Sequence, residues 1–220
     1  MTDAAKPKLY AYWRTSATYR IRVALALKGL GVEEIEVNLD KGEQYEPAFQ
    51  AINPQGALPT YVEPGHAPMT QSMAILEYLE ERHPEPALLP RDLFERARVR
   101  AIAAQMTSDT HPLIVPRVKK YLIGEAGFDD STWRAWQIRW FTRGLTALEA
   151  QLSGDPATGA FCHGETPTIA DICLCSITAV ARVFKIEVAA IPTIDRIVAT
   201  CEALDAFAGA DPMRQRGAPA

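Results

Sequence analysis

The chain has 220 residues, of which 48% are hydrophobic, so it can bury a sizeable core in one domain or in two small ones. No apolar run approaches the ~18 residues typical of a membrane span, and the opening stretch MTDAAKPK lacks the apolar core of a secretory signal, so we expect a cytoplasmic protein. The net charge of −4 and the isoelectric point near 5.6 argue against nucleic acid or an anionic membrane as the main partner.

The beginning of the chain alternates between strand and helix patterns. Residues 8–13, KLYAYW, are aromatic and alternate in polarity, which predicts a strand. Residues 19–28 carry apolar side chains at helical spacing and are followed by Gly29 and Gly31, which end the helix. Residues 33–40, EEIEVNLD, return to the alternation of a strand. These patterns predict the order strand, helix, strand.

A polar, irregular stretch separates these elements from the next ones. Residues 57–64, ALPTYVEP, predict a third short strand, and GHAPM after it predicts a turn that can include a further short strand. Residues 72–82 have the pattern of a helix. Residues 84–90, PEPALLP, break every pattern, and we interpret them as a linker.

Beyond the linker the chain is helical in period and has no convincing strand. Two stripes recur at helical spacing and are interpreted as core: Trp133, Trp136 and Trp140, then Leu145, Leu148 and Leu152. We therefore predict a small α/β domain over residues 1–83, a linker at 84–90 and an all-helical domain over 91–220.

The four cysteines all lie in the last third of the chain, at Cys162, Cys173, Cys175 and Cys201. Their spacing matches neither a zinc site nor a redox pair, so no metal site is expected. We interpret them as small buried side chains in a reducing compartment.

The stretch YWRTSATYRIR places Thr15, Ser16 and Thr18 between Arg14 and Arg20. The predicted strand ends here and the helix begins, and the N–H groups and dipole of a helix start favour an anion. Hydroxyl donors at such a place can hold a thiolate. Since no cysteine is near in the sequence, that thiol would have to come from a cofactor. The alternative is that one hydroxyl merely caps the helix.

Two further features extend this hypothesis. Pro59 cannot donate to a strand ladder, and a cis bond between Leu58 and Pro59 would expose the backbone of Leu58 to a peptide-like ligand. Gln71 and Ser72 stand at another predicted helix start, where a hydroxyl and free N–H groups can bind a carboxylate. Each has an ordinary alternative, an edge proline and an N-cap. Together they predict a groove for a short anionic peptide that bears a thiol.

Four motifs in this order resemble the zeta class of glutathione transferases, the family of maleylacetoacetate isomerase: YWRTSATYRIRVALALKG, NPQGALPTYV, TQSMAILEYLEE and GETPTIADICL. The resemblance extends from about Lys8 to Arg214. It implies a thioredoxin-like N-terminal domain, a C-terminal helical bundle, glutathione as cofactor and a cytoplasmic homodimer. In TPTIAD, it implies that Thr168 and Asp171 cap a buried helix.

The resemblance also implies roles for individual residues. Thr15 takes the position of the thiolate-holding serine, with Ser16 beside it, and Ala17 stands where many members have cysteine. The expected glutathione contacts are Gln44, the backbone clamp Leu58 and Pro59, the carboxylate binders Gln71 and Ser72, and His111.

The implied reaction is the cis–trans isomerisation of maleylacetoacetate to fumarylacetoacetate in aromatic-acid or tyrosine breakdown. A thiolate adds to the double bond, the bond rotates and the thiolate leaves, while Arg14, Arg117 and Arg182 are candidates to bind the carboxylates of a small dicarboxylate substrate. Zeta isomerases usually have an arginine where this chain has Val183. Maleylpyruvate or a halogenated acid is therefore an alternative substrate, and conjugation to glutathione is an alternative reaction. A third interpretation is a scaffold protein that binds glutathione without turnover.

Overall fold

The computed structural model describes residues 6–219. Residues 1–5, which belong to the stretch judged to lack a secretory signal, and residue 220 lie outside it. The chain forms two compact units. The first contains the described residues up to Leu88 together with those from Leu204 onward, and the second spans Leu89–Ala203.

The first unit is built on a four-stranded sheet in the order β2-β1-β3-β4. Its strands are β1 (Lys8–Ala11), β2 (Glu33–Glu36), β3 (Thr60–Val62) and β4 (Met69–Thr70). β1 pairs with β2 in parallel, with Tyr10 opposite Ile35, whereas the β1–β3 and β3–β4 pairs are antiparallel. The predicted strands are confirmed, although β1 and β2 end earlier than their patterns suggested.

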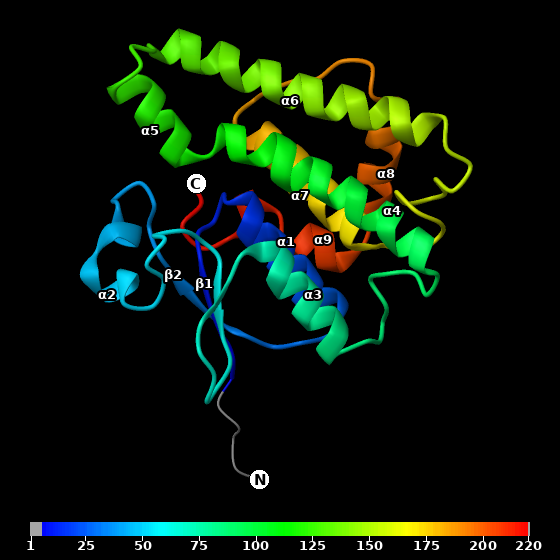
Figure 1. Ribbon diagram of the computed structural model, residues 1–220, viewed down its shortest axis with the longest axis horizontal. Helices are drawn as coiled ribbons and strands as arrows, with labels where there is room; N and C mark the ends of the chain where they lie inside the picture. Colours follow the sequence, from blue (N-terminus) through cyan, green and yellow to red (C-terminus); the bar gives the residue numbers. More distant parts are fainter. Residues whose placement is uncertain (1–5, 220) are drawn as a thin grey trace. The chain divides into compact units, whose positions relative to one another are not determined.

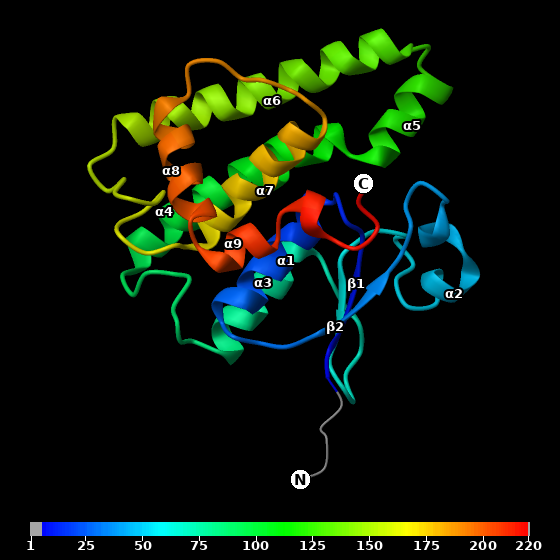
Figure 2. The ribbon, with the colours of Figure 1, turned by 180° about the vertical axis from the view of Figure 1, so that it is seen from behind.

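Two long helices accompany this sheet, α1 (Ser16–Leu27) and α3 (Ser72–Arg82). They pack side by side, and α9 (Asp205–Gly209) lies against α1 (Figures 1 and 2). The irregular stretch holds two elements that its sequence did not reveal, η1 (Glu43–Tyr45) and α2 (Pro47–Gln50). The unit also contains η4 (Pro212–Arg214).

A buried ion pair joins the two long helices. Lys28, at the end of α1, places its Nζ 2.8 Å from Glu80 Oε2 on α3, and the lysine side chain is fully enclosed. Nζ also donates to the carbonyl oxygens of His83 and Pro86, and the same Glu80 oxygen accepts from the backbone N–H of Leu88. The pair therefore fixes the segment after α3 as well as the contact between the helices.

The end of the chain joins the first unit because α9 packs on α1 and carries the buried side chain of Phe207. The sequence had suggested 91–220 as one helical domain because its helical period continues to the end. A sequence pattern predicts only that residues 204–219 are helical, whereas the unit to which they belong depends on the helices against which they pack.

The regular elements described in the second unit are all helices, joined by irregular loops. Its elements are α4 (Leu93–Ala104), the π-helical segment η2 (Gln105–Thr110), η3 (His111–Ile114), α5 (Pro116–Gly124), α6 (Asp130–Ser153), α7 (Ile169–Val183) and α8 (Pro192–Glu202). α7 packs against α4 and α8 and is buried over nearly its whole length. Within residues 6–219, none of the helices combines the length and apolar character needed to cross a membrane.

The start of α7 is held by the expected capping box. Asp171 Oδ2 accepts from the backbone N–H and the hydroxyl of Thr168, at 2.8 Å each. Asp171 Oδ1 accepts from the N–H of Cys162 at 2.7 Å, which anchors the preceding loop. Both the cap and its structural role agree with the interpretation of the TPTIAD motif.

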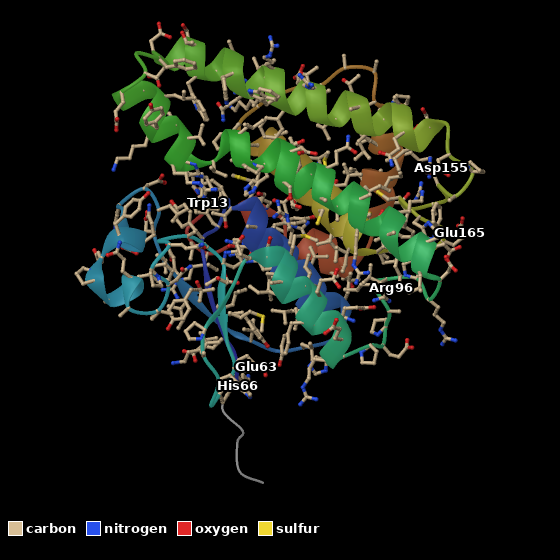
Figure 3. All side chains as sticks on the ribbon, in the orientation of Figure 1. Trp13, Glu63, His66, Arg96, Asp155 and Glu165 are labelled. Atoms are coloured by element: carbon tan, nitrogen blue, oxygen red, sulfur yellow. The ribbon has the colours of Figure 1, made fainter. Side chains whose placement is uncertain are left out.

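The same loop is tied to α4 by one arginine. Arg98 donates to Asp155 Oδ2 at 2.7 Å, to the carbonyl of Cys162 at 2.7 Å and to Thr158 Oγ1 at 3.0 Å. Asp155 and Glu165 mark the loop in Figure 3. These bonds give an irregular segment a defined conformation.

Of the two core stripes predicted for α6, the leucine stripe is confirmed, because all three leucines are buried, whereas the tryptophan stripe is confirmed only in part. Trp133 is also buried, while Trp136 and Trp140 are half-buried and pack edge to face, and Trp136 donates to the carbonyl of Leu113. All four cysteines are buried free thiols, as interpreted from their spacing.

Candidate active site

The hydroxyls at the start of α1 have different surroundings. Thr15 is the N-cap residue, yet its side chain makes no capping hydrogen bond within the described structure. Its Oγ1 lies 3.2 Å from the carbonyl of Tyr12 and 2.5 Å from Thr18 Oγ1. Ser16 is only 2% exposed, and Arg20 donates to its Oγ at 3.4 Å. Thr15 is thus the more accessible hydroxyl, while Ser16 faces the interior.

The start of α3 brings a second hydroxyl and a strained backbone together. Ser72 is the first helical residue, is 7% exposed, and accepts a 2.9 Å hydrogen bond from Arg20 Nη1. Gln71 before it has φ +69°, a conformation that is unfavourable for a residue with a Cβ. Such strain concentrates at ligand-binding positions. The Gln71 side chain donates to Gln55 Oε1 at 3.0 Å.

The loop before β3 is organised by Asn53, a residue that the sequence analysis missed. Asn53 is 1% exposed, and its Nδ2 donates to the carbonyl of Ala57 at 2.7 Å and to Thr60 Oγ1 at 3.0 Å. Its Oδ1 accepts from the backbone N–H of Gln55. The Leu58–Pro59 bond that follows is cis. An asparagine in the turn-rich string NPQG was the available signal for this loop.

Gln44 lies against this loop. Gly56 approaches η1 so closely that a Cβ on it would stand 2.9 Å from the carbonyl oxygen of Gln44. Gln44 itself is 5% exposed, and its side-chain Oε1 is buried with no hydrogen-bond partner among the described residues. A buried acceptor of this kind needs a donor, and a ligand amide can supply one.

These features fit a thiol-bearing anionic peptide such as glutathione. The first unit offers an accessible hydroxyl at one helix start, a hydroxyl backed by an arginine at another, and a buried amide oxygen without a protein donor. Hydroxyls and helix starts suit a thiolate and a carboxylate, and the free oxygen suits a peptide N–H.

Arg14 is held beside the start of α1. Its Nη1 donates to Asp40 Oδ2 at 2.8 Å, its Nη2 pairs with Oδ1, and its guanidinium lies over the rings of Tyr12 and Trp13. Tyr12 donates to Asp40 as well, at 2.6 Å. Burial raises the pKa of Asp40, but the hydrogen bonds from Arg14 and Tyr12 outweigh it and hold that pKa below its usual value.

The other sequence-predicted residues belong to the second unit. His111 is half-buried at the start of η3, and Arg117 is exposed on α5. Arg182, near the end of α7, pairs with Glu202 of α8, and the last residue of α7 is the half-buried Val183. Their roles toward glutathione and substrate remain predictions. The residues from 6 to 219 gather no three His, Cys, Asp or Glu side chains able to hold a metal ion.

Comparison with known proteins adds independent information. Residues 5–81 match the family model described as glutathione S-transferase, N-terminal domain. The chain is 42% identical to a maleylpyruvate isomerase of a Ralstonia species over 208 residues, which cover 94% of this chain and 98% of that one. It is 43% identical to the maleylacetoacetate isomerase of Pseudomonas aeruginosa over 216 residues, 97% of this chain and 99% of that one.

A solved structure agrees with these relatives. The crystal structure of a maleylacetoacetate isomerase from Methylobacterium extorquens AM1, with bound malonate and glutathione, superposes with a TM-score of 0.95 at 45% identity. The match covers 97% of this chain and 100% of the M. extorquens chain.

Proposed function

The chain belongs to the zeta class of glutathione transferases, and from this premise we propose that it is a glutathione-dependent isomerase that converts maleylacetoacetate to fumarylacetoacetate. The observation that carries the proposal is the pair of hydroxyls at two helix starts in the first unit, Thr15 and Ser72. The Gln44 oxygen of the same unit, which has no hydrogen-bond partner among residues 6–219, supports it. The P. aeruginosa and M. extorquens relatives are named maleylacetoacetate isomerases, and this chain matches them over nearly their full length.

Bound glutathione would supply the thiolate that adds to the cis double bond and leaves after rotation. In our proposal Thr15 donates a hydrogen bond to the sulfur and lowers the pKa of the thiol. Ser72 and the N–H groups at the start of α3 bind the γ-glutamyl carboxylate, and the backbone of Leu58 pairs with the peptide. Gln44 accepts a hydrogen bond from a ligand N–H.

The substrate's carboxylates need cations, and Arg14 is the candidate of the first unit. Its guanidinium is oriented by Asp40 and stacked on two aromatic rings, so little conformational freedom remains to be lost when an anion binds. We propose that it stabilises the charge that develops on the substrate during addition. Arg117, Arg182 and His111 remain candidate contributors from the second unit.

A second candidate function follows from the end of α7. Val183 occupies the position where this class usually has an arginine, and the neighbouring Arg182 forms an ion pair with Glu202. The alternative substrate is therefore one that needs a different arrangement of positive charge, such as maleylpyruvate, or a halogenated acid that becomes conjugated to glutathione.

We also propose that the protein is a homodimer in the cytoplasm, where a reducing environment keeps four free thiols reduced.

The test asks whether glutathione is a catalyst or a reactant. The protein is incubated with maleylacetoacetate or maleylpyruvate and substoichiometric glutathione, and free thiol and trans product are followed together. We expect many equivalents of product with no fall in free thiol, and none with S-methyl glutathione, in which the nucleophile is blocked. Thiol loss that matches product formation from a halogenated acid, without isomerisation of either maleyl compound, would establish conjugation instead. Glutathione binding without any turnover would leave only the scaffold.

A further inference from the structure

A single buried arginine connects the two helix starts of the candidate site. Arg20 lies in the second turn of α1 and is 2% exposed, although it carries a full charge. Its Nη1 donates to Ser72 Oγ at 2.9 Å and its Nη2 lies 3.4 Å from Ser16 Oγ. Residues 20 and 72 are 52 positions apart, so the pairing arises only in the folded unit.

The hydrogen bond from Arg20 decides how Ser72 can act. A guanidinium only donates, whereas a serine hydroxyl has one proton and two acceptor lone pairs. When Arg20 fills one acceptor position of Ser72, the proton of that hydroxyl points elsewhere. At the start of α3 an incoming carboxylate is the acceptor best suited to receive it.

The charge of Arg20 acts in the same direction. A guanidinium stays protonated at every physiological pH, and burial in the unit reduces its screening by water. An anion bound to the Ser72 hydroxyl lies one atom beyond the arginine, so it is favoured over a neutral group of the same shape. Arg20 does not need to touch the ligand to have this effect.

We propose that Arg20 is a positioning residue for glutathione, which sets the Ser72 hydroxyl as a donor and makes this subsite selective for the γ-glutamyl carboxylate. The inference rests on the proposed function, because it presumes that the first unit binds glutathione. Arg20 is then the group that determines which end of the peptide the first unit recognises.

The experiment compares two ligands on the full chain. Dissociation constants are measured by calorimetry for glutathione and for 4-aminobutanoyl-cysteinylglycine, which lacks only the α-carboxylate of the γ-glutamyl group. Loss of a hydrogen bond to a charged group typically weakens binding by about 10- to 100-fold. We expect Arg20→Gln to weaken glutathione binding by this factor and to leave the binding of the analogue nearly unchanged.

Four further variants separate positioning from general support of the fold. Ser72→Ala should lose the same selectivity. The double variant Arg20→Gln/Ser72→Ala should bind glutathione no more weakly than the single variant with the lower affinity, because both substitutions remove the same interaction. Arg22→Gln is the matched control, since Arg22 is on the same helix but pairs with Glu34. It should keep wild-type selectivity. If Arg20→Gln does not fold, Arg20→Lys keeps the charge without the planar fork and should show a smaller loss of selectivity.

Kinetics provide a second readout. We expect the Arg20 variants to raise the KM for glutathione, while kcat at saturating glutathione changes less than threefold. This is the pattern of a defect in binding and not in the chemical step. Equal weakening of both ligands, or additive losses in the double variant, would show that Arg20 only supports packing and would overturn the proposal. A wild-type protein that binds no glutathione would overturn the proposed function itself, and this inference with it.

Discussion

Replacing Thr15 by valine should produce a loss of activity that depends on pH. The substitution keeps the volume and shape of the side chain and removes only the hydroxyl. In the structure Thr15 Oγ1 donates to the enclosed Thr18 Oγ1 at 2.5 Å. A hydroxyl proton rotates about its C–O bond, so the same proton can turn from Thr18 to a bound sulfur.

The magnitude follows from one charge-assisted hydrogen bond. Such a bond contributes about 1.5–3 kcal/mol, and one pKa unit corresponds to about 1.4 kcal/mol, so removing it should raise the pKa of bound glutathione by about 1–2 units. A free thiol has a pKa of ~8.5. Below the wild-type thiol pKa the variant therefore has about 10- to 100-fold less thiolate. Well above pH ~8.5 both proteins hold mostly thiolate, and the difference should shrink toward its smallest value.

The assay measures initial isomerisation rates at saturating glutathione across this pH range, with the ultraviolet absorbance of the thiolate as a direct titration. Ser16→Ala serves as the comparison, because that hydroxyl is buried toward Arg20. A loss in Thr15→Val that is equal at every pH would refute the reasoning. Wild-type activity in Thr15→Val together with an inactive Ser16→Ala would identify Ser16 as the hydroxyl that holds the sulfur.

Three other predictions concern stability. Lys28→Met leaves a glutamate buried without its cation and should lower the free energy of unfolding by about 3–5 kcal/mol; a change under about 1 kcal/mol in urea titration would contradict it. Thr168→Ala removes half of the capping box and should cost about 1–2 kcal/mol, whereas no shift in midpoint would mean that the cap is replaceable. Asp40 has a folded pKa below its ordinary 3.8, so its ion pair stabilises the fold above that pH and is lost as pH falls through the folded value. Asp40→Asn should therefore destabilise at pH 7, with the difference from wild type vanishing in strong acid; a difference that persists there would count against the pair.

The sequence by itself determined the elements whose signals are local. Alternation and helical period predicted β1, α1, β3 and α3. The resemblance of TPTIAD to the family motif implied the capping box of Thr168 and Asp171, whose two members are three residues apart. The hydroxyls at the two helix starts were recognisable for the same reason. α2 was missed because a helix of four residues has too little period to be seen.

Only the tertiary structure decided which of these groups act together. The burial of Arg20 beside Ser72 was not predicted from the sequence, because it follows from the packing of α1 on α3. The partnership of Arg14 with Asp40 and the attachment of α9 to the first unit have the same origin. Contacts between distant segments depend on how whole elements pack, and an arginine carries no local mark of whether it will face water or a buried hydroxyl.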